Sequence, residues 1–393
     1  MCAAQVCGML GVFAFPALLP HFRELWSLSN SQAGWINGIY FVGYTLAVLF
    51  LTSLTDRMDA RKICMACCLI GFLANLGFAM AVNGFWLALL FRAFAGLGLA
   101  GTFIPGLKAL IDRLPSSFHP RAVSFYTASF GLGLSLSFYV TGLIFEGFGW
   151  RIAFGGAAVG SLVALVLFFF MLTPRPVDKD QAKASLKEIL DFRPAWRDAQ
   201  TRSYILAYMC HMWEMFAARS WMVAFLAFSL GLHEVAKNHP APTTVMAVAG
   251  IFGTIASILG GELAVRFGRR RAVRGIMAIS CLTALSMGFA AHLPYLAVAG
   301  LCIFYTVFFQ GDSAAIHSGV INAAKPERRG SAMALQSLGG FAAASVGTVV
   351  AGVALDLSGG GLTAWSWGIT FGIMGLAALA GNLLLRGSKP PGT

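Results

Sequence analysis

Charged side chains are scarce in this sequence. Only 11% of its 393 residues are Asp, Glu, Lys or Arg, whereas 58% are hydrophobic. A water-soluble fold of this length uses about a quarter of its residues as charged groups to cover its surface. The composition therefore excludes an ordinary soluble domain, and we expect the chain to have the lipid bilayer as its surroundings.

Motifs for enzyme chemistry are also lacking. No nucleotide-binding glycine loop, zinc motif or nucleophile elbow occurs in a credible context, so we expect neither an enzyme nor a bound cofactor. The eight cysteines lie mostly in apolar stretches, where a free thiol acts as a small hydrophobe, and no disulfide framework is expected. The chain opens without a basic region or a convincing cleavage site, so its first apolar stretch is expected to be retained.

What the sequence has instead is a series of long apolar stretches. A helix needs about 20 such residues to cross the hydrocarbon of a membrane. Twelve stretches qualify: residues 1–20, 34–53, 63–82, 85–110, 121–145, 152–172, 203–230, 243–265, 273–291, 294–322, 331–355 and 362–385. The alternating pattern of a transmembrane β-barrel is absent. The predicted fold class is an all-α membrane protein with twelve transmembrane helices.

The formal charge is +12, and the Lys and Arg residues behind it are unevenly distributed between the two sides of the membrane. With the amino terminus inside, 22 Lys and Arg residues fall in cytoplasmic segments, and only Arg23, Arg151 and Lys237 fall on the opposite face. This asymmetry predicts a multi-pass protein of the bacterial inner (plasma) membrane with both termini in the cytoplasm. Because the basic residues are explained by topology, no nucleic-acid partner is expected.

One long polar stretch divides the apolar helices six and six. It suggests an N-terminal bundle over residues 1–172, a cytoplasmic linker over 173–201 and a C-terminal bundle over 202–393. Within the linker, residues 182–190 suit either a short amphipathic helix on the membrane surface or a solvated connector.

An internal repeat relates the two halves. Arg57 aligns with Arg266 at an offset of 209 residues, and the stretch from Gly142 aligns with the stretch from Gly352 at an offset of 210. Both matches occupy corresponding points of the two halves, which predicts two six-helix bundles related by a pseudo-two-fold axis.

The loops at these points resemble the signature loop of the major facilitator superfamily, in which a Gly, three residues and Asp-Arg precede a Gly and further basic residues. One copy has Asp56 and Arg57 but Thr52 and Asp59 at the glycine positions, and the other has Gly261, Arg266, Gly268, Arg269 and Arg270 but Val265 at the acidic position. The resemblance implies two bundles that rock around a central cavity by alternating access. It also implies gating by Asp56, Arg57, Arg266 and Arg269; ordinary positive-inside anchoring is the alternative.

A second resemblance lies in the fourth predicted helix. Arg92 is followed by Gly96, Gly98 and Gly101, like the helix-4 motif of the same superfamily. The Gly-Pro pair of its antiporter signature is missing from the fifth helix, which argues mildly against a drug/proton antiporter.

Ionisable residues within the predicted spans are candidates for transport, because each one costs about 2.5–3.5 kcal/mol on insertion scales. They are Arg92, Lys108, His211, Glu214, Arg219, Asp312 and His317. The resemblance implies that helices 1, 4, 7 and 10 line the cavity, and these residues lie on three of those four.

Glu214 and Asp312 are the predicted proton-coupling carboxylates. Glu214 lies three residues after His211 and five before Arg219, so a proton can be exchanged near neutral pH. The alternative is a static buried ion pair of Glu214 with Arg219 or Arg92.

Arg92 and Arg219 are the predicted substrate ligands, because a guanidinium matches a carboxylate or phosphate. The surplus of cations over acids in the spans favours an anionic cargo. The other predicted substrate-binding residues are His211, Tyr126, Gln310 and Gln336.

The function expected is a monomeric secondary transporter that moves a small, anionic organic solute with protons across the membrane. Two alternatives stay open: efflux of a hydrophobic drug or metabolite, and import of Cu(I) or another soft metal. The metal would use the thioether, thiol and imidazole groups of Met209, Cys210, His211, Met212 and Met215. Packing of flexible Met side chains also explains that cluster.

Overall fold

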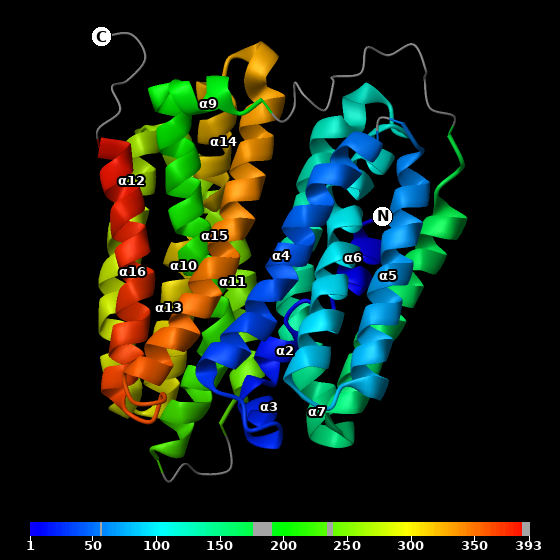
Figure 1. The fold of residues 1–393 in the computed structure, drawn as a ribbon. Coiled ribbons are helices and arrows are strands. Elements are labelled where there is room, and N and C mark those ends of the chain that lie inside the picture. The colour runs from blue at the N-terminus through cyan, green and yellow to red at the C-terminus, as the bar shows by residue number, and fades with distance from the viewer. Residues whose placement is uncertain (56, 176–190, 234–238, 387–393) are drawn as a thin grey trace. The chain divides into compact units, whose positions relative to one another are not determined.

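The structure is a computed structural model that describes residues 1–55, 57–175, 191–233 and 239–386. Regular structure in these ranges is helical throughout, with no strand among them (Figure 1). The prediction of an all-α fold is therefore confirmed.

Most helices follow the predicted spans, with exceptions at residues 1–20 and 294–322 and within α7 (His119–Met171). Their bounds are α1 Cys2–Gly8, α2 Ala14–Ala17, α3 Leu19–Leu25, α4 Asn30–Leu54, α5 Ala60–Ala81, α6 Phe85–Ile111, α7 His119–Met171, α9 Arg193–Arg197, α10 Ala199–Gly231, α11 Pro242–Phe267, α12 Arg269–Met287, α13 Tyr295–Gly311, α14 Ser313–Ala323, α15 Arg329–Leu357 and α16 Ala364–Arg386. Short 3-10 turns cover Ser116–Phe118, Gly288–His292 and Pro326–Arg328.

Several helices are long and apolar enough to cross a membrane. Within the described residues there are eight such stretches: Ala60–Ala81, Phe85–Ile111, Arg121–Met171, Pro242–Phe267, Arg269–His292, Tyr295–Ala323, Arg329–Leu357 and Ala364–Arg386. The chain is thus a multi-pass membrane protein. Twelve spans in two six-helix bundles, the inner-membrane location and the cytoplasmic termini stay predictions.

Helices pack into two compact units. Unit 1 contains residues Met1–Leu28, Trp35–Lys183 and Ala241–Ile251, and unit 2 contains Ser29–Gly34, Ala184–Pro240 and Phe252–Thr393. The predicted boundaries at 172 and 202 stay a prediction, and residues 182–190 of the predicted linker lie outside the described residues.

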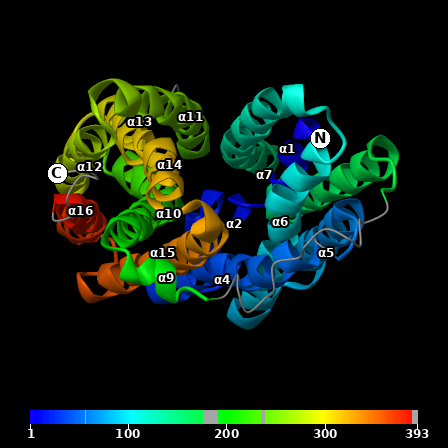
Figure 2. The same cartoon turned by 90° about the horizontal axis from the view of Figure 1, so that it is seen from above.

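Each unit has its own core. In unit 1, α7 packs against α1 and α5, and α5 packs against α6 (Figure 2). In unit 2, α10 is surrounded by α13, α14, α15 and α16, and α12 packs against α13 and α16. Small side chains such as Ala164 and Ala332 are fully buried where helices meet, which allows close helix packing in lipid.

Two predicted spans are interrupted. The stretch 1–20 is not one helix: α1 ends at Gly8, and a turn over residues 9–13 leads into α2 and α3. The stretch 294–322 is divided between α13 and α14, with Asp312 at the junction. Backbone N–H and C=O groups that are not bonded within a helix must find hydrogen-bond partners elsewhere in the protein when they lie inside a membrane. We therefore expect side chains to bond the backbone at both interruptions.

A sharp turn joins the fifth and sixth predicted spans within α7. Gly149 there has φ +80°, a left-handed conformation that other residues adopt only at a cost, and the chain reverses before Trp150. This explains a glycine at this position.

Candidate functional site

Helix α10 carries three buried ionisable side chains of unit 2. Its first turn is capped by Asp198, whose carboxylate accepts a hydrogen bond from the Thr201 backbone N–H at 2.7 Å. His211, Glu214 and Arg219 follow on the helix and are 1%, 2% and 3% exposed. Because α13, α14, α15 and α16 surround α10, these three side chains are held inside the unit.

Two hydroxyl groups hold Glu214. Its Oε1 atom accepts hydrogen bonds from Ser280 Oγ of α12 at 2.8 Å and from the Tyr305 hydroxyl of α13 at 3.0 Å. Neutral donors therefore satisfy the Oε1 atom of this carboxyl group. Such a setting suits a group that gains and loses a proton, because its partners carry no fixed charge to compensate the anion.

His211 and Asp312 form a buried pair. The Nδ1 atom of His211 lies 2.7 Å from Oδ1 of Asp312, which occupies the junction between α13 and α14. The Nε2 atom of His211 is buried and has no hydrogen-bond partner among the described residues. The pair holds two titratable groups within hydrogen-bond distance.

Arg219 contacts α13 one turn before that junction. Its guanidinium donates to Oε1 of Gln310 at 2.9 Å and lies 5.9 Å from the centre of the Phe309 ring. The predicted ligands Arg219 and Gln310 are thus brought together, beside an aromatic ring. This combination of cation, amide and aromatic face can bind an aromatic carboxylate.

A third polar pair lies on α14 and α15. Gln336 Nε2 lies 3.1 Å from His317 Nδ1, and the Tyr208 ring centre is 5.9 Å from that of His211 and 6.5 Å from that of His317. The Gln336 Oε1 atom is buried without a partner among the described residues. The Tyr208 ring thus lies near both histidines and links the His211–Asp312 pair with the His317–Gln336 pair.

In unit 1, Arg92 supports the interrupted first span. Its two terminal nitrogens donate to the carbonyl oxygens of Gly11 and Val12 at 2.9 and 2.8 Å, and its guanidinium lies 4.2 Å from the Tyr40 ring centre. The side chain is 2% exposed. These contacts give Arg92 a structural role, and its role as a substrate ligand stays a prediction.

Ser137 completes the support of the same turn. Its hydroxyl donates to the Leu10 carbonyl at 2.7 Å and accepts from the Phe13 N–H at 2.9 Å. Tyr126, predicted to bind substrate, donates to the Thr102 carbonyl and is fully buried between α6 and α7. Its observed contacts are those of a packing residue.

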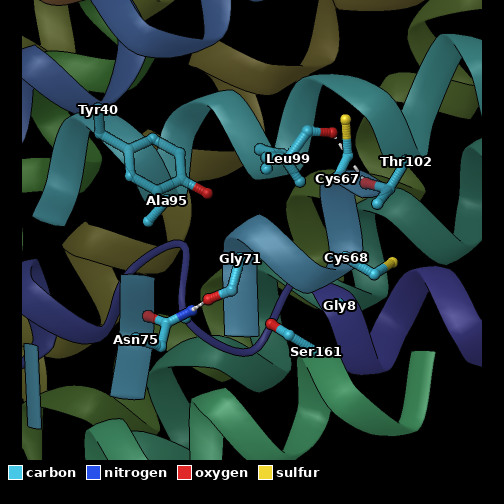
Figure 3. Close-up of a pocket in the computed structure, with 12 residues that line it drawn as sticks. Gly8, Tyr40, Cys67, Cys68, Gly71, Asn75, Ala95, Leu99, Thr102 and Ser161 are labelled. Carbon is cyan, nitrogen blue, oxygen red and sulfur yellow. Dashed lines mark hydrogen bonds between the residues drawn. The ribbon is translucent and has the colours of Figure 1, made fainter. Parts of the chain in front are cut away.

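A narrow pocket lies beside this turn in unit 1. Its lining includes Tyr40, Cys67, Asn75, Thr102 and Ser161 (Figure 3). Figure 3 shows the Asn75 amide bonded to the Gly71 carbonyl, a contact of 2.9 Å. The space suffices for about one water molecule, so the pocket does not hold an organic solute.

The gating residues are placed differently from one another. Asp56 lies outside the described residues, Arg57 and Arg266 are exposed, and Arg269 is half-buried. Their gating role stays a prediction.

The neighbouring Asp59, by contrast, is the centre of a network. It caps α5 by accepting from Arg61 N at 3.0 Å, and it also accepts from Arg113 at 2.8 Å and from Arg175 N at 2.9 Å. Burial raises the pKa of the Asp59 carboxyl, but these hydrogen bonds outweigh burial, so its pKa lies below the usual value.

The Met, Cys and His side chains of α10 contact several neighbouring helices. Met209 and Met212 lie against Gly339 and Gly340 of α15, Cys210 lies against Gly381 of α16, and His211 contacts Asp312. In the part of the chain that is described, no group of three or more His, Cys, Asp or Glu side chains could hold a metal ion. The soft-metal alternative, which relies mainly on Met thioethers, stays a prediction.

Four residues of these networks were not predicted as site residues from the sequence: Asp59, Ser137, Ser280 and Tyr305. The three hydroxyl residues stand in apolar helices, where such residues are common and carry no charge signal. Asp59 lies four residues before the predicted span 63–82 and directly before α5, and Asp is a preferred N-cap residue, so a capping signal was available for it.

Comparisons with known proteins place this geometry in context. A sequence profile described as Major Facilitator Superfamily matches residues 1–315. The niacin transporter NiaP of Acinetobacter baylyi is 30% identical over 158 residues, which is 40% of this chain and 35% of that relative. The gentisate transporter of Corynebacterium glutamicum is 26% identical over 387 residues, which cover 93% of this chain and 81% of that relative.

Among solved structures, that of the nucleoside transporter NupG superposes with a TM-score of 0.79. It is 18% identical in sequence and covers 98% of this chain and 99% of that one. At this identity the likeness shows a shared fold alone.

Proposed function

Because the chain belongs to the Major Facilitator Superfamily, we propose that it carries a small aromatic carboxylate, together with protons, across the bacterial inner membrane. It works by alternating access, with twelve spans in two six-helix bundles and both termini in the cytoplasm. Niacin and gentisate, the cargoes in the names of two relatives, are both aromatic acids, which supports this substrate class.

The observation that carries the proposal is the contact of Arg219 with Gln310 beside Phe309. The guanidinium supplies charge for a carboxylate, the Gln310 amide supplies orientation, and the Phe309 ring supplies an apolar face. Arg219 is 3% exposed, so the free energy of a charge-assisted hydrogen bond is not lost to competition with bulk water.

Proton coupling rests on Glu214. Its hydrogen-bond donors, Ser280 and Tyr305, are neutral, and a charged carboxylate inside the membrane costs about 2.5–3.5 kcal/mol on insertion scales. Binding of a proton removes that charge. The His211–Asp312 pair supplies a second titratable group on the same helix face of unit 2.

The test is uptake of radiolabelled gentisate and niacin into proteoliposomes under an imposed pH gradient. We expect the gradient to accelerate uptake in the wild type. Arg219→Gln should raise KM about ten- to a hundredfold, since hydrogen bonds to charged groups contribute about 1.5–3 kcal/mol. Glu214→Gln should abolish the acceleration but retain exchange of labelled for unlabelled substrate.

Two exposed residues serve as matched controls. Arg271→Gln and Glu262→Gln remove the same charges from exposed positions in unit 2 and should leave uptake unchanged. Absence of uptake of any aromatic acid would refute the substrate class. Uptake that ignores the pH gradient would refute proton coupling.

A further inference from the structure

The first turn of α4 is bound by a carboxylate from a distant helix. Asp356, near the end of α15, accepts from the Asn30 N–H at 3.0 Å and from the Asn30 side-chain amide at 2.8 Å through Oδ1. Its Oδ2 atom accepts from the Ser31 N–H at 2.8 Å and from the Ser31 hydroxyl at 2.6 Å. One side chain thereby receives four hydrogen bonds from the start of another helix.

Glycines bring the two helices close enough for this contact. A Cβ atom added at Gly352 of α15 would lie 2.3 Å from the Asn30 carbonyl oxygen, and one added at Gly34 of α4 would lie 3.0 Å from the Thr348 carbonyl oxygen. The backbones therefore touch where Asp356 binds. Residues Ser29–Gly34 accordingly belong to unit 2, while the rest of α4, from Trp35, belongs to unit 1.

Two other helix starts, those of α5 and α10, are capped locally. Asp59 caps α5 two residues before Arg61, and Asp198 caps α10 three residues before Thr201. A local cap forms with its helix and persists whatever the helix packs against. The cap on α4 comes from 325 residues away along the chain, so it exists only while α4 and α15 are docked.

The repeat-related position gives a contrast. Gly142 corresponds to Gly352, and a Cβ atom there would meet the Thr243 hydroxyl at the start of α11. Glu146 corresponds to Asp356, yet it is exposed and makes no side-chain hydrogen bond within the described residues. Close helix approach is thus common to both places, whereas among the described residues a carboxylate from the repeat-related position binds the helix start at α4 and not at α11.

We propose that Asp356 is a releasable clamp that holds the first turn of α4 on α15 in one conformation and frees it in another. The inference rests on the proposed function, because alternating access requires helices to change partners during each cycle. The four hydrogen bonds add to the attraction between a carboxylate and the positive end of a helix. These interactions set the free-energy barrier to leaving the conformation in which α4 is docked on α15.

A covalent lock tests whether the clamp must open. In the double variant Ser31→Cys with Asp356→Cys, oxidation joins the two positions and reduction frees them. We expect the reduced protein to exchange gentisate and the oxidised protein to lose that exchange, with recovery after addition of a reductant. The single variants, oxidised in the same way, should keep their activity. Undiminished exchange in the locked protein would overturn the proposal.

Hydrogen exchange gives a readout that does not depend on a substrate. Asp356→Asn should speed amide exchange across Ser29–Gly34 by about tenfold or more, because one carboxylate oxygen becomes an NH2 donor and either the Asn30 or the Ser31 N–H loses its acceptor. The isosteric Asn keeps the side chain's shape, and Glu146→Gln should leave that segment unchanged. Wild-type exchange rates in Asp356→Asn would refute the clamp, whereas a wild type that carries no aromatic acid would refute only the proposed cargo.

Discussion

At the scale of single residues, the cap that Asp59 forms on α5 is expected to make the stability of the protein depend on pH. Its pKa in the folded protein lies below that of an unfolded chain, about 3.9. The free energy of folding that Asp59 contributes is therefore fully present at a pH above its pKa in the unfolded chain. This contribution is lost as the pH falls through its lower pKa in the folded protein. We predict that Asp59→Asn lowers the Tm at neutral pH and that the gap to the wild type narrows on acidification from about pH 5 to pH 3.

Thermal unfolding of the purified protein across this pH range measures the effect. Glu24→Gln, at an exposed position, should follow the wild type at every pH. A Tm gap between Asp59→Asn and the wild type that stays constant down to pH 3 would contradict the assignment.

The residues of unit 2 show what sequence reasoning finds and what it misses. Glu214, Arg219 and Asp312 stood out because a charge in an apolar stretch is costly and therefore rare. Their partners Ser280 and Tyr305 did not, because these hydroxyl residues are 66 and 91 positions from Glu214 and only the packing of α10 against α12 and α13 joins them.

At the scale of helices, the interrupted first span depends on Arg92. Replacing it leaves the Gly11 and Val12 carbonyls without their donors, and an unsatisfied buried acceptor costs about 1–3 kcal/mol. We predict that Arg92→Met lowers the Tm by several degrees without any ligand present. Arg92→Lys should restore little, since one ammonium group cannot reproduce a planar fork on two carbonyls.

Thermal unfolding in detergent provides the measurement, with the exposed Arg271→Met as the control. If Arg92→Met unfolds at the wild-type temperature, the carbonyl contacts are not what stabilises the turn. The substrate role predicted for Arg92 would then regain support.

Hydropathy located the helices but not their interruptions. It averages over about 20 residues and does not distinguish a straight helix from α1 followed by a turn and α2. Gly11 and Gly311 stand near the two interruptions, but glycine is frequent in this chain, with 45 in total, and so marks no single place. Tertiary contacts such as those of Ser137 hold the first interruption, and such contacts leave no trace in hydropathy.

At the scale of the whole molecule, the distribution of basic residues predicts the topology. With 22 Lys and Arg residues assigned to one side and three to the other, we expect the C-terminus and the stretch between residues 175 and 191 in the cytoplasm. The stretch between residues 233 and 239 should face outward. Fusions to green fluorescent protein should fluoresce at the first two places, and alkaline phosphatase should be active only at the third.

Phosphatase activity at the C-terminus would reverse the proposed orientation. The matching halves, by contrast, follow from repeats at offsets of 209 and 210 residues rather than from charge, so that part of the architecture would survive. Sequence thus predicts the class of fold at this scale, while the cargo depends on side chains whose neighbours only folding brings together.

The carbonyls that Arg92 binds have a consequence for how the protein is made. Gly11 and Val12 leave the ribosome about 80 residues before Arg92, so its acceptors are already in the membrane when this permanently charged side chain arrives. Glu214 has the opposite history, because Ser280 and Tyr305 are synthesised after it. We therefore expect the turn at Gly11 and Val12 to be supported as soon as Arg92 is inserted, and the contacts of Glu214 to form only after α12 and α13 follow.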